Sequence, residues 1–548
     1  MKTPVQVIPL GGVGEIGKNC TAIRQDDDIV VIDVGLSFPD DEMPGVDIIV
    51  PDFSYLIENR DKIRGIFLTH AHEDHVGGLP YLVEHIEAPI YTSEFTHALI
   101  AQKLEEKCDA RHIKKIVLKT GEIVQCGSLS VEPVRITHSI PETFAMAIRT
   151  RHGIILMTSD FKFDFTPVDH KLSNIARLGE LGEEGVLALL SDSTNVERPG
   201  WGPSEREVSH GLRKVFTEAE GRVLLTTFAS SIHRMQQVYD VAAETGRKVA
   251  VVGRRMESNV DICSRMGYLK IPKNTRIMLD EIKMHEPHEL AILTTGSQGE
   301  PMSALVQMSK QEYGRLKLQS GDTLIYSARP IPGNESGVWK TINRLFKMGV
   351  NVVYSSNIDV PVHVSGHAYQ EELKMMINIT KPFYVAPVHG EPRHQHQYLE
   401  MARDMGYPEH RAFTFENGLP LCFDETNAWF GDPIQSGAIM VDSSGHHGVT
   451  QDVLKERLQL SQSGVVTVAL PVTGRMKLTS APKVSARGFL GDEVDLESVA
   501  DLIADYLGSE PNRIENDANL ISETEGLVRR HLQKRTGARP VVLVSVVR

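Results

Sequence analysis

The sequence has few cysteines and no long apolar segment. Its five cysteines, among 548 residues, include no C-x-x-C pair, which indicates buried thiols in a reducing compartment rather than a disulfide framework or a zinc–thiolate site. No apolar run reaches the roughly 18 residues that a membrane-spanning helix needs. The first ten residues lack the basic and apolar segments of a signal peptide. These absences predict a cytoplasmic protein without a membrane segment.

Positive charge is also scarce, because the formal net charge is −14 at pH 7. This balance argues against a protein that coats nucleic acid through a general positive field. It leaves a nuclease open, since a nuclease needs positive charge only along a groove and its acidic metal site is neutralised by ions. With 41% hydrophobic and 24% charged residues, the chain otherwise has the composition of a globular protein of several domains.

Alternating apolar runs and polar turns predict a layered α/β fold. Continuous apolar runs read as strands buried on both faces, at residues 5–10, 29–34, 65–69, 154–158 and 186–190. From about residue 204 the pattern changes to alternating helices and strands, which is typical of an open parallel sheet. After residue 351 strand-like segments resume. A stretch rich in Gly, Ser, Asp and His then reads as a linker, and the last part again alternates helices and strands.

The densest cluster of metal-binding side chains is the run His-Ala-His-Glu-Asp-His at residues 70–75, directly after a predicted strand. Residues two apart in an extended segment point the same way, so His70 and His72 can hold one ion while Asp74 and His75 face a neighbouring position. Imidazole and carboxylate suit zinc or manganese. A single histidine is more often a surface or hydrogen-bonded residue, but this density of ligands predicts a metal site.

Further ligands are expected at the ends of other strands, because six residues cannot fill two coordination spheres. His138, Asp160 and His389 each end an apolar run, and Asp33 ends a strand in the same way. Each of them taken alone is equally well explained as a turn former at a strand end. Together they supply the donors of a paired site, with an acidic residue that can bridge two ions.

This series of motifs resembles the metallo-β-lactamase superfamily, in which two ions lie at the edge of an αββα sandwich. The resemblance implies that Asp160 bridges the ions, that Asp74 is catalytic as well as a ligand, and that Asp33 orients the ligands from behind. Two ions roughly 3.5–4 Å apart polarise a phosphoryl group and lower the pKa of a bridging water toward about 7. The implied ligands are His70, His72 and His138 for the first ion, and Asp74, His75 and His389 for the second.

More than two hundred residues separate Asp160 from His389, and the second α/β pattern lies between them. This arrangement resembles the β-CASP nuclease branch of the superfamily, in which an inserted domain closes over the metals. The acidic motif A of that branch matches Asp192, its motif B matches His367 and its motif C matches His389. Histidine at motif C goes with RNA substrates in this branch, whereas the DNA-repair members carry valine, so RNA is favoured.

Three longer segments, residues 11–19, 159–164 and 192–195, resemble the bacterial ribonuclease J family. Ser159 departs from the family pattern, which commonly has glycine before the bridging Asp, and we expect serine to be tolerated. The resemblance covers about residues 5–440, and the C-terminal part is similar in size and texture. It implies a 5′-to-3′ exonuclease on single-stranded RNA with a 5′-monophosphate, with endonuclease activity as well, in RNA decay and maturation.

The resemblance also implies an order of domains and a set of partners. The C-terminal domain supports dimers in the family, so a homodimer is expected, with an RNA-degradation complex as a further partner. The expected segments are a metallo-β-lactamase domain in two parts (1–205 and 366–435), an inserted β-CASP domain (206–365), a linker (436–455) and a C-terminal α/β domain (456–548).

Two loops are candidates for the substrate pocket. The first offers imidazole, hydroxyl and backbone N–H donors to a phosphate, and consists of His363, Val364, Ser365, Gly366 and His367. The second ends a strand and opens a helix, which gives an anion site, and consists of Phe228, Ala229, Ser230 and Ser231. Together, the two loops resemble the pocket that accepts a 5′-monophosphate in that family. An alternative for the two serines is a simple helix N-cap pair.

The predicted catalytic residues are Asp74, Asp192 and His367, of which His367 is a general acid or a stabiliser of the leaving 3′-oxygen. Three other interpretations stay open. A DNA-directed nuclease of the same branch is disfavoured by His389, and a small-molecule hydrolase is disfavoured by the inserted domain. A noncatalytic RNA-binding scaffold is disfavoured because no ligand position is substituted. Zinc and manganese remain equal candidates, and the acidic residues 40–42 with Asp47 are a candidate for an extra structural ion.

Overall fold

The structure is a computed structural model that describes residues 3–40, 42–108, 112–331, 333–442, 449–473, 477–489, 493–509 and 516–548. Asp41, part of the acidic stretch considered for an extra ion, lies outside these residues. The chain divides into two compact units. The larger comprises Met1–Phe38 with Ile49–Ala438, and the smaller comprises Pro39–Ile48 with Ile439–Arg548. No helix in the described ranges is both long and apolar enough to cross a membrane.

Two facing sheets form one of the two domains of the larger unit. One sheet has the order β20 (Ala428–Phe430), β19 (Leu421–Phe423), β1 (Val5–Gly11), β2 (Cys20–Gln25), β3 (Asp28–Ile32), β5 (Ile63–Phe67), β6 (Ile90–Thr92), β7 (Lys115–Val117). The other has the order β18 (Tyr384–Val388), β12 (Val186–Asp192), β11 (Gly153–Met157), β10 (Thr143–Thr150), β9 (Leu129–Ile136), β8 (Val124–Cys126). Their facing sides share one apolar core, in which Phe67 and Val30 meet Met146 and Ile155.

Helices cover the outer sides of this pair of sheets. Helices α5 (Ile175–Glu184), α11 (Gln370–Thr380) and α12 (Pro392–Asp404) pack on the six-stranded sheet through a second core cluster. Helices α3 (Leu79–Val83) and α4 (Glu94–Lys107) pack against each other, and α4 contacts β7 of the other sheet. The predicted αββα sandwich is therefore confirmed. The strands read as continuous apolar runs because each is covered on one side by the shared core and on the other by helices.

A separate parallel sheet is formed by the part of the chain between two strands that are neighbours in the sandwich. The chain leaves the six-stranded sheet at β12 and returns at β18, which pairs in parallel with β12. In between it forms the sheet β14 (Lys248–Val252), β15 (Leu290–Thr294), β13 (Val223–Thr226), β16 (Thr323–Tyr326), β17 (Asn351–Val353). All its neighbours are parallel, which confirms the predicted inserted α/β domain.

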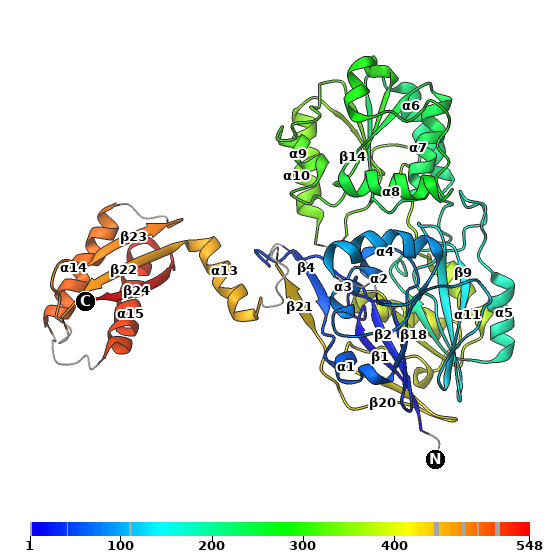
Figure 1. Cartoon of the computed structure of the whole chain (residues 1–548), viewed down its shortest axis with the longest axis horizontal. Coiled ribbons are helices and arrows are strands. Elements are labelled where there is room, and N and C mark those ends of the chain that lie inside the picture. Colours follow the sequence, from blue (N-terminus) through cyan, green and yellow to red (C-terminus); the bar gives the residue numbers. More distant parts are fainter. Residues whose placement is uncertain are drawn as a thin grey trace. The chain divides into compact units, whose positions relative to one another are not determined.

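Helices cover both faces of the inserted sheet. On one face lie α6 (Glu207–Glu218), α7 (Ile232–Glu244) and α8 (Arg254–Arg265), and on the other lie α9 (Ala304–Ser309) and α10 (Glu335–Lys347) (Figure 1). The apolar cluster under α6, α7 and α8 also includes Ala71, Phe95 and Ile140 from the sandwich. The core of the inserted domain is thus continuous with the part of the sandwich that carries residues 70–75.

The smaller unit is a mixed sheet with helices. Strands β23 (Lys483–Arg487), β22 (Val465–Pro471) and β24 (Val541–Val547) form the sheet, with β22 parallel to β24. Helices α14 (Glu493–Ser509) and α15 (Asp517–Thr536) share its apolar core, and α13 (Gln451–Ser463) contacts β24. Strand β23 was not predicted, and neither was the inclusion of residues 39–48 in this unit, where the Asp47 N–H donates to the Val441 carbonyl (2.9 Å).

Within the predicted linker, β21 (Ala438–Val441) forms a short strand, α13 begins before the linker's predicted end, and residues 443–448 lie outside the described ranges. The strand-like segments expected after residue 351 include two helices instead, α11 and α12. In α11 the apolar residues Leu373, Met376 and Ile377 follow helical spacing and are buried. Several histidines and prolines around these helices obscured that period in the sequence.

A buried ion-pair network joins β9, β10 and α5 in the sandwich. The Glu132 carboxylate, with 2% of its side chain exposed, accepts from Arg177 Nε (2.7 Å) and lies 2.8 Å from Arg149 Nη1. Burial alone raises the pKa of Glu132, but hydrogen bonds from the two arginines lower it more, so the net direction is down. The carboxylate therefore contributes stability above its unfolded pKa of about 4.3, and loses it as the pH falls through its lower folded pKa.

We expect Glu132→Gln to lower the free energy of unfolding of the larger unit by about 2–4 kcal/mol at pH 7, because two guanidinium groups lose their buried partner. The difference from wild type should shrink below about pH 4.3, where the unfolded carboxylate is protonated. Urea unfolding at pH 7 and at pH 4 measures both effects. Glu183→Gln, which removes an exposed partner of Lys381, is the control and should unfold at the same urea concentration as wild type. Equal losses for Glu132→Gln at both pH values would contradict this account.

Candidate metal centre

Residues 70–75 form a tightly held segment that follows β5 and includes the first three residues of the short helix α2 (Glu73–Val76). The Asn19 N–H donates to the Asp74 carbonyl (3.0 Å), and the Val34 N–H donates to the His75 carbonyl (2.8 Å). Gly35 packs so close that a Cβ atom there would lie 1.7 Å from the Asp74 carbonyl oxygen. The loop is therefore fixed by backbone contacts on the side away from its ligand atoms, and residue 35 must be glycine.

The first group of facing donors consists of His70, His72, His138 and Asp160, with ligand atoms all within 4.8 Å of one another. His72 Nδ1 lies 3.0 Å from His70 Nε2 and 3.2 Å from His138 Nε2. Burial lowers the pKa of His72 to about 4, and burial with neighbouring imidazoles lowers the pKa of His70 and His138 well below the usual value. All three rings are thus neutral at pH 7, the form that binds metal ions.

The second group consists of Asp74, His75, Asp160 and His389. His75 Nε2 lies 3.2 Å from Asp160 Oδ2, and His389 Nε2 lies 3.3 Å from Asp74 Oδ2. Asp160 belongs to both groups and lies between them. The structure therefore brings together all seven residues that the sequence analysis named as ligands, although they come from four separate segments of the chain.

Contacts behind these side chains set the orientation of the rings. Asp33 is fully buried and accepts from His75 Nδ1 (2.7 Å), from the Thr69 N–H (2.8 Å) and from the Thr69 hydroxyl (2.8 Å). Because the Thr69 hydroxyl donates to Asp33, its oxygen is left to accept from His70 Nδ1 (3.0 Å). His138 Nδ1 donates to the Gly366 carbonyl (2.8 Å). In these three histidines Nδ1 forms a hydrogen bond away from the centre, which leaves the lone pair of Nε2 to bind a metal ion.

Three residues at the centre have left-handed backbone conformations, namely Asp33 (φ 60°), Ser159 (φ 57°) and His389 (φ 49°). Such a conformation costs a non-glycine residue about 1–3 kcal/mol and persists only where the surroundings enforce it. At Ser159 it supplies the physical reason why glycine is common in the family at this position. The serine hydroxyl lies 3.3 Å from His70 Nδ1, a contact that glycine could not make.

His367 and Asp192 form a pair beside the two ligand groups. His367 Nδ1 lies 2.9 Å from Asp192 Oδ2, and its Nε2 lies 4.0 Å from Asp160 Oδ2. Burial lowers the pKa of His367, but the carboxylates of Asp192 and Asp160 outweigh it and raise that pKa above the usual value. A third donor group, with ligand atoms all within 4.8 Å of one another, consists of Asp160, Asp192, His367 and His389. A ligand role for His367 is therefore an alternative to a role in proton transfer.

The loop at residues 363–367 is held by hydrogen bonds that leave the Ser365 hydroxyl able to donate to a ligand. The Ser365 oxygen accepts from Asn195 Nδ2 (2.8 Å) and from the His367 N–H (3.2 Å), so its own hydroxyl hydrogen is left to donate. Lys162, almost fully buried, donates from Nζ to the Ser365 carbonyl (3.2 Å). Burial and the charges of Arg234, Arg329, Lys162 and Arg198 lower the pKa of His363. A neutral imidazole thus stands among four cations, next to the donor groups.

The loop at residues 228–231 opens helix α7. Ser231 is the N-cap residue of this helix, but its side chain makes no capping hydrogen bond. Phe228 and Ala229 pack against the two core clusters of the inserted domain, and Val364 is buried. Among the described residues no hydrogen bond joins the two predicted pocket loops directly, and Arg234 in α7 instead donates to the Val362 carbonyl (3.3 Å).

Several residues of the site were given no role by the sequence analysis. Thr69, Asn195 and Lys162 orient ligands or the 363–367 loop through hydrogen bonds. Asn19 belongs to the same set, since its Nδ2 lies 3.1 Å from His75 Nε2. Each stands within or next to a motif that had been singled out, and that adjacency was the only available signal.

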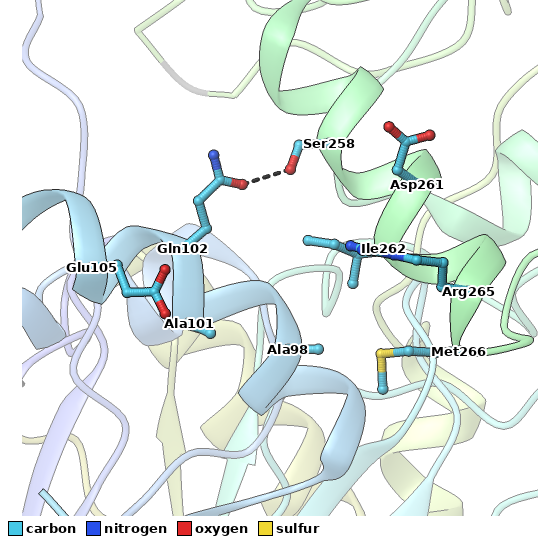
Figure 2. A pocket seen from close by; sticks show the side chains of 9 residues that line it. All are labelled: Ala98, Ala101, Gln102, Glu105, Ser258, Asp261, Ile262, Arg265 and Met266. Carbon is cyan, nitrogen blue, oxygen red and sulfur yellow. Dashed lines mark hydrogen bonds between the residues drawn. The ribbon is translucent and has the colours of Figure 1, made fainter. Parts of the chain in front are cut away.

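A separate cavity of about 460 Å³ lies between α4 of the sandwich and α8 of the inserted domain (Figure 2). Gln102 reaches across to accept a hydrogen bond from the Ser258 hydroxyl (2.5 Å). Close by, Glu73 binds Lys103 of α4 (2.5 Å) and Arg255 of α8 (2.9 Å). No histidine lines this cavity. It belongs to the contact between the two domains and contributes no ligand to the metal centre.

Four family models match the chain in succession. They describe the metallo-beta-lactamase superfamily (residues 13–145), the ribonuclease J beta-CASP domain (220–345), a Zn-dependent metallo-hydrolase RNA specificity domain (358–412) and the ribonuclease J C-terminal domain (452–548). The solved structure of a protein of unknown function from Enterococcus faecalis matches with a TM-score of 0.55 at 16% identity, over 77% of this chain and all of that one. That likeness bears on the fold alone.

Curated relatives match at higher identity. Ribonuclease J of Thermus thermophilus is 40% identical over 99% of this chain and 95% of its own length. Ribonuclease J 1 of Streptococcus pyogenes is 38% identical over 99% and 97%, and ribonuclease J2 of Bacillus subtilis is 39% identical over 89% and 87%. With this identity over nearly the full length of both chains, and with the order of domain matches, the chain belongs to the ribonuclease J family.

Proposed function

We propose that this chain hydrolyses the phosphodiester backbone of single-stranded RNA with two divalent ions, zinc or manganese. It acts as a 5′-to-3′ exonuclease on RNA with a 5′-monophosphate and also as an endonuclease. The observation that carries the proposal is the pair of donor groups that share Asp160, next to a loop rich in phosphate donors. The family match to an RNA specificity domain supports RNA as the substrate.

The residues present fit two such ions. The first group offers three neutral imidazoles and a carboxylate, and the second offers two carboxylates and two imidazoles, a mixture that suits zinc and manganese. The nitrogen atoms of the first group face one another at hydrogen-bond distance, an arrangement that a shared cation stabilises. When bound, the ions would polarise the scissile phosphoryl group and lower the pKa of a water between them toward about 7.

His367 is proposed as the group that gives a proton to the leaving 3′-oxygen. Its Nδ1 is held by Asp192, which fixes the ring so that Nε2 faces the centre. The Thr194 N–H in turn binds Asp192 Oδ1 (2.9 Å) and keeps that carboxylate in place. Asp74 lies at the rim of the second donor group, with its side chain 30% exposed, and is assigned a catalytic role besides its role as a ligand.

The 5′-monophosphate is assigned to the loops at 363–367 and 228–231. The free hydroxyl hydrogen of Ser365 and the cations around His363 suit a terminal phosphate. The hydroxyl group of Ser231, which makes no capping hydrogen bond to α7, and that of Ser230 next to it would add donors at the start of a helix. A pocket that holds the phosphate at the end of the chain would place the first phosphodiester at the metal centre, and would so account for removal of one nucleotide at a time.

The remaining proposals concern the chain as a whole. We keep the domain limits 1–205, 206–365, 366–435, 436–455 and 456–548, and assign homodimer formation to the C-terminal domain. No two of the five cysteines form a disulfide, which suits the cytoplasm, where thiols stay reduced. The activity would serve RNA decay and maturation, with an RNA-degradation complex as a further partner.

The test is a digest of one 3′-labelled RNA that carries a 5′-monophosphate, a 5′-triphosphate or a 5′-hydroxyl, with Mn²⁺ or Zn²⁺. We expect processive release of mononucleotides from the monophosphate form, and only internal cuts in the other two. Equal cleavage of single-stranded DNA would favour the DNA-directed alternative. Tight RNA binding without cleavage in either metal would favour the noncatalytic scaffold. Either result would overturn the proposal.

His367→Ala should retain its metal ions and lose about 10²-fold or more in rate, the scale expected for removal of a general acid. Metal content by elemental analysis and single-turnover hydrolysis of the monophosphorylated RNA measure the two effects. His396→Ala is the control, because His396 is an exposed residue of α12 whose ring lies 3.2 Å from Glu400. Loss of metal together with activity would assign His367 to the ligands, and an unchanged rate would refute both roles.

Gly366→Ala should disturb the metal centre from the side of the phosphate loop. A Cβ atom at this position would lie 2.7 Å from His138 Cε1 and 2.8 Å from its Nδ1, so the ring must move away from its present hydrogen bond. We expect metal affinity to fall about 10- to 100-fold, as for other losses of contacts behind a ligand. Gly314→Ala, where the added carbon meets nothing within 4 Å, is the control. Equal metal affinity in the two variants would show that the ring adjusts freely.

A further inference from the structure

Two exposed aromatic side chains lie side by side on the sandwich, outside the metal centre. The rings of Phe165 and Trp201 have centroids 6.2 Å apart, and 57% and 51% of these residues are exposed. We call them the aromatic pair. Burial of aromatic rings is a large source of stability in proteins, so two neighbouring rings left half in water indicate a binding role.

The aromatic pair stands on two loops that lead out of the catalytic site. Phe165 is five residues after Asp160, and Trp201 is nine residues after Asp192. The loops are joined, because the Thr166 hydroxyl donates to the Ser204 hydroxyl (2.9 Å) and the Glu205 N–H donates to Asp164 Oδ2 (2.8 Å). Their inner parts hold the bridging ligand and the carboxylate that binds His367.

Gly202, next to Trp201 in the sequence, contacts Tyr369 and Glu372, which follow the 363–367 loop. The Gly202 N–H donates to Glu372 (2.8 Å), and a Cβ atom at Gly202 would lie 3.5 Å from the ring of Tyr369. Tyr369 follows His367 by two residues, a distance of about 7 Å of extended chain. The aromatic pair is therefore at the rim of the site, within a few residue lengths of the proposed proton donor.

Arginines without carboxylate partners accompany the aromatic pair. Arg198 donates to the Tyr369 hydroxyl (3.0 Å), and Arg206 donates to the Pro167 carbonyl (3.5 Å) and to His170 (3.3 Å). As far as the structure describes the chain, neither of them nor Arg329 forms an ion pair with an acidic side chain. In a chain of net charge −14, three such arginines near the site leave positive charge free for phosphates.

We propose that Trp201, backed by Phe165, is a stacking platform for a base of single-stranded RNA on the 3′ side of the scissile bond, with Arg198 and Arg206 binding the adjoining phosphates. The inference rests on the proposed function. If the 5′-phosphate and the first nucleotide occupy the inner pocket, only the 3′ part of the RNA can reach the rim. Every base has a π-face, so such a platform binds RNA of any sequence, as an enzyme that degrades RNA from one end requires.

Tryptophan fluorescence gives a readout that does not depend on activity. The chain has three tryptophans, so Trp339→Phe combined with Trp429→Phe leaves Trp201 alone. Titration of that variant with hydrolysis-resistant phosphorothioate oligoribonucleotides, from the dinucleotide to the decanucleotide, should quench Trp201 only above a minimum length. Bound decanucleotide without any change in the fluorescence of Trp201 would overturn the proposal.

The affinity of the same oligonucleotides tests the energetic part. Trp201→Ala should weaken binding of the decanucleotide about tenfold, within the range for loss of one base stack, and raise KM more than it lowers kcat. The loss should grow with RNA length, and Trp201→Phe should restore most of the affinity. Trp339→Ala, which removes a half-exposed tryptophan packed on Tyr354 in the inserted domain, is the control and should bind as wild type does.

The outcomes separate this proposal from the proposed function. Equal affinity of wild type and Trp201→Ala, with RNA hydrolysis intact, overturns the platform and leaves the nuclease. Absence of both RNA binding and hydrolysis in the wild type overturns both. If Trp201→Ala instead reduces the molar mass in light scattering and leaves RNA affinity unchanged, a second copy of the chain covers the aromatic pair, and the platform is wrong.

Discussion

A single buried carboxylate is the constraint around which the larger unit is organised. Asp160, 2% exposed, lies within 4.0 Å of five imidazole rings, those of His70, His75, His138, His367 and His389. Burial raises the pKa of Asp160, but the surrounding histidines outweigh it and lower that pKa well below its usual range. A buried charge is tolerated only with partners of this kind. The rings come from the ends of strands in both sheets and from the loop after the inserted domain, so the fold brings four distant segments to one carboxylate.

How much of this could be predicted from the sequence depended on the kind of signal. Buried strands have continuous apolar runs, and ligands at strand ends have unusual residue types, so the sandwich and the donor groups were accessible. The hydrogen bonds of Thr69 and Asn195 were not, because small polar residues occur everywhere and only the fold decides which of them meets a ligand. The left-handed conformation of Asp33 also leaves no mark in the sequence, since it is imposed by contacts with Thr69 and His75. The helices α11 and α12 were missed where histidines and prolines hide the helical period.

The metal loop has two sides with two functions. Residues 70 and 72 offer their rings to the centre, whereas Ala71 between them joins the apolar core of the inserted domain. Glu73, the next residue, binds Lys103 in the sandwich and Arg255 in the inserted domain. Alternate residues of an extended segment point in opposite directions, so one short stretch serves chemistry on one side and domain contact on the other. The placement of the inserted domain and the geometry of the ligands are thus mechanically coupled through this loop.

The order of ligands along the chain has a consequence for biosynthesis. Strand β18 enters the six-stranded sheet beside β12, and His389 follows directly after it. A nascent chain shorter than 389 of the 548 residues therefore has an open sheet edge and an incomplete second donor group, however well its first half has folded. On the proposed mechanism it would have no hydrolytic activity while the ribosome is still translating the first two thirds of its own message. The inserted domain thus sets the order of assembly, because the first donor group can form before the domain is synthesised and the second only after it.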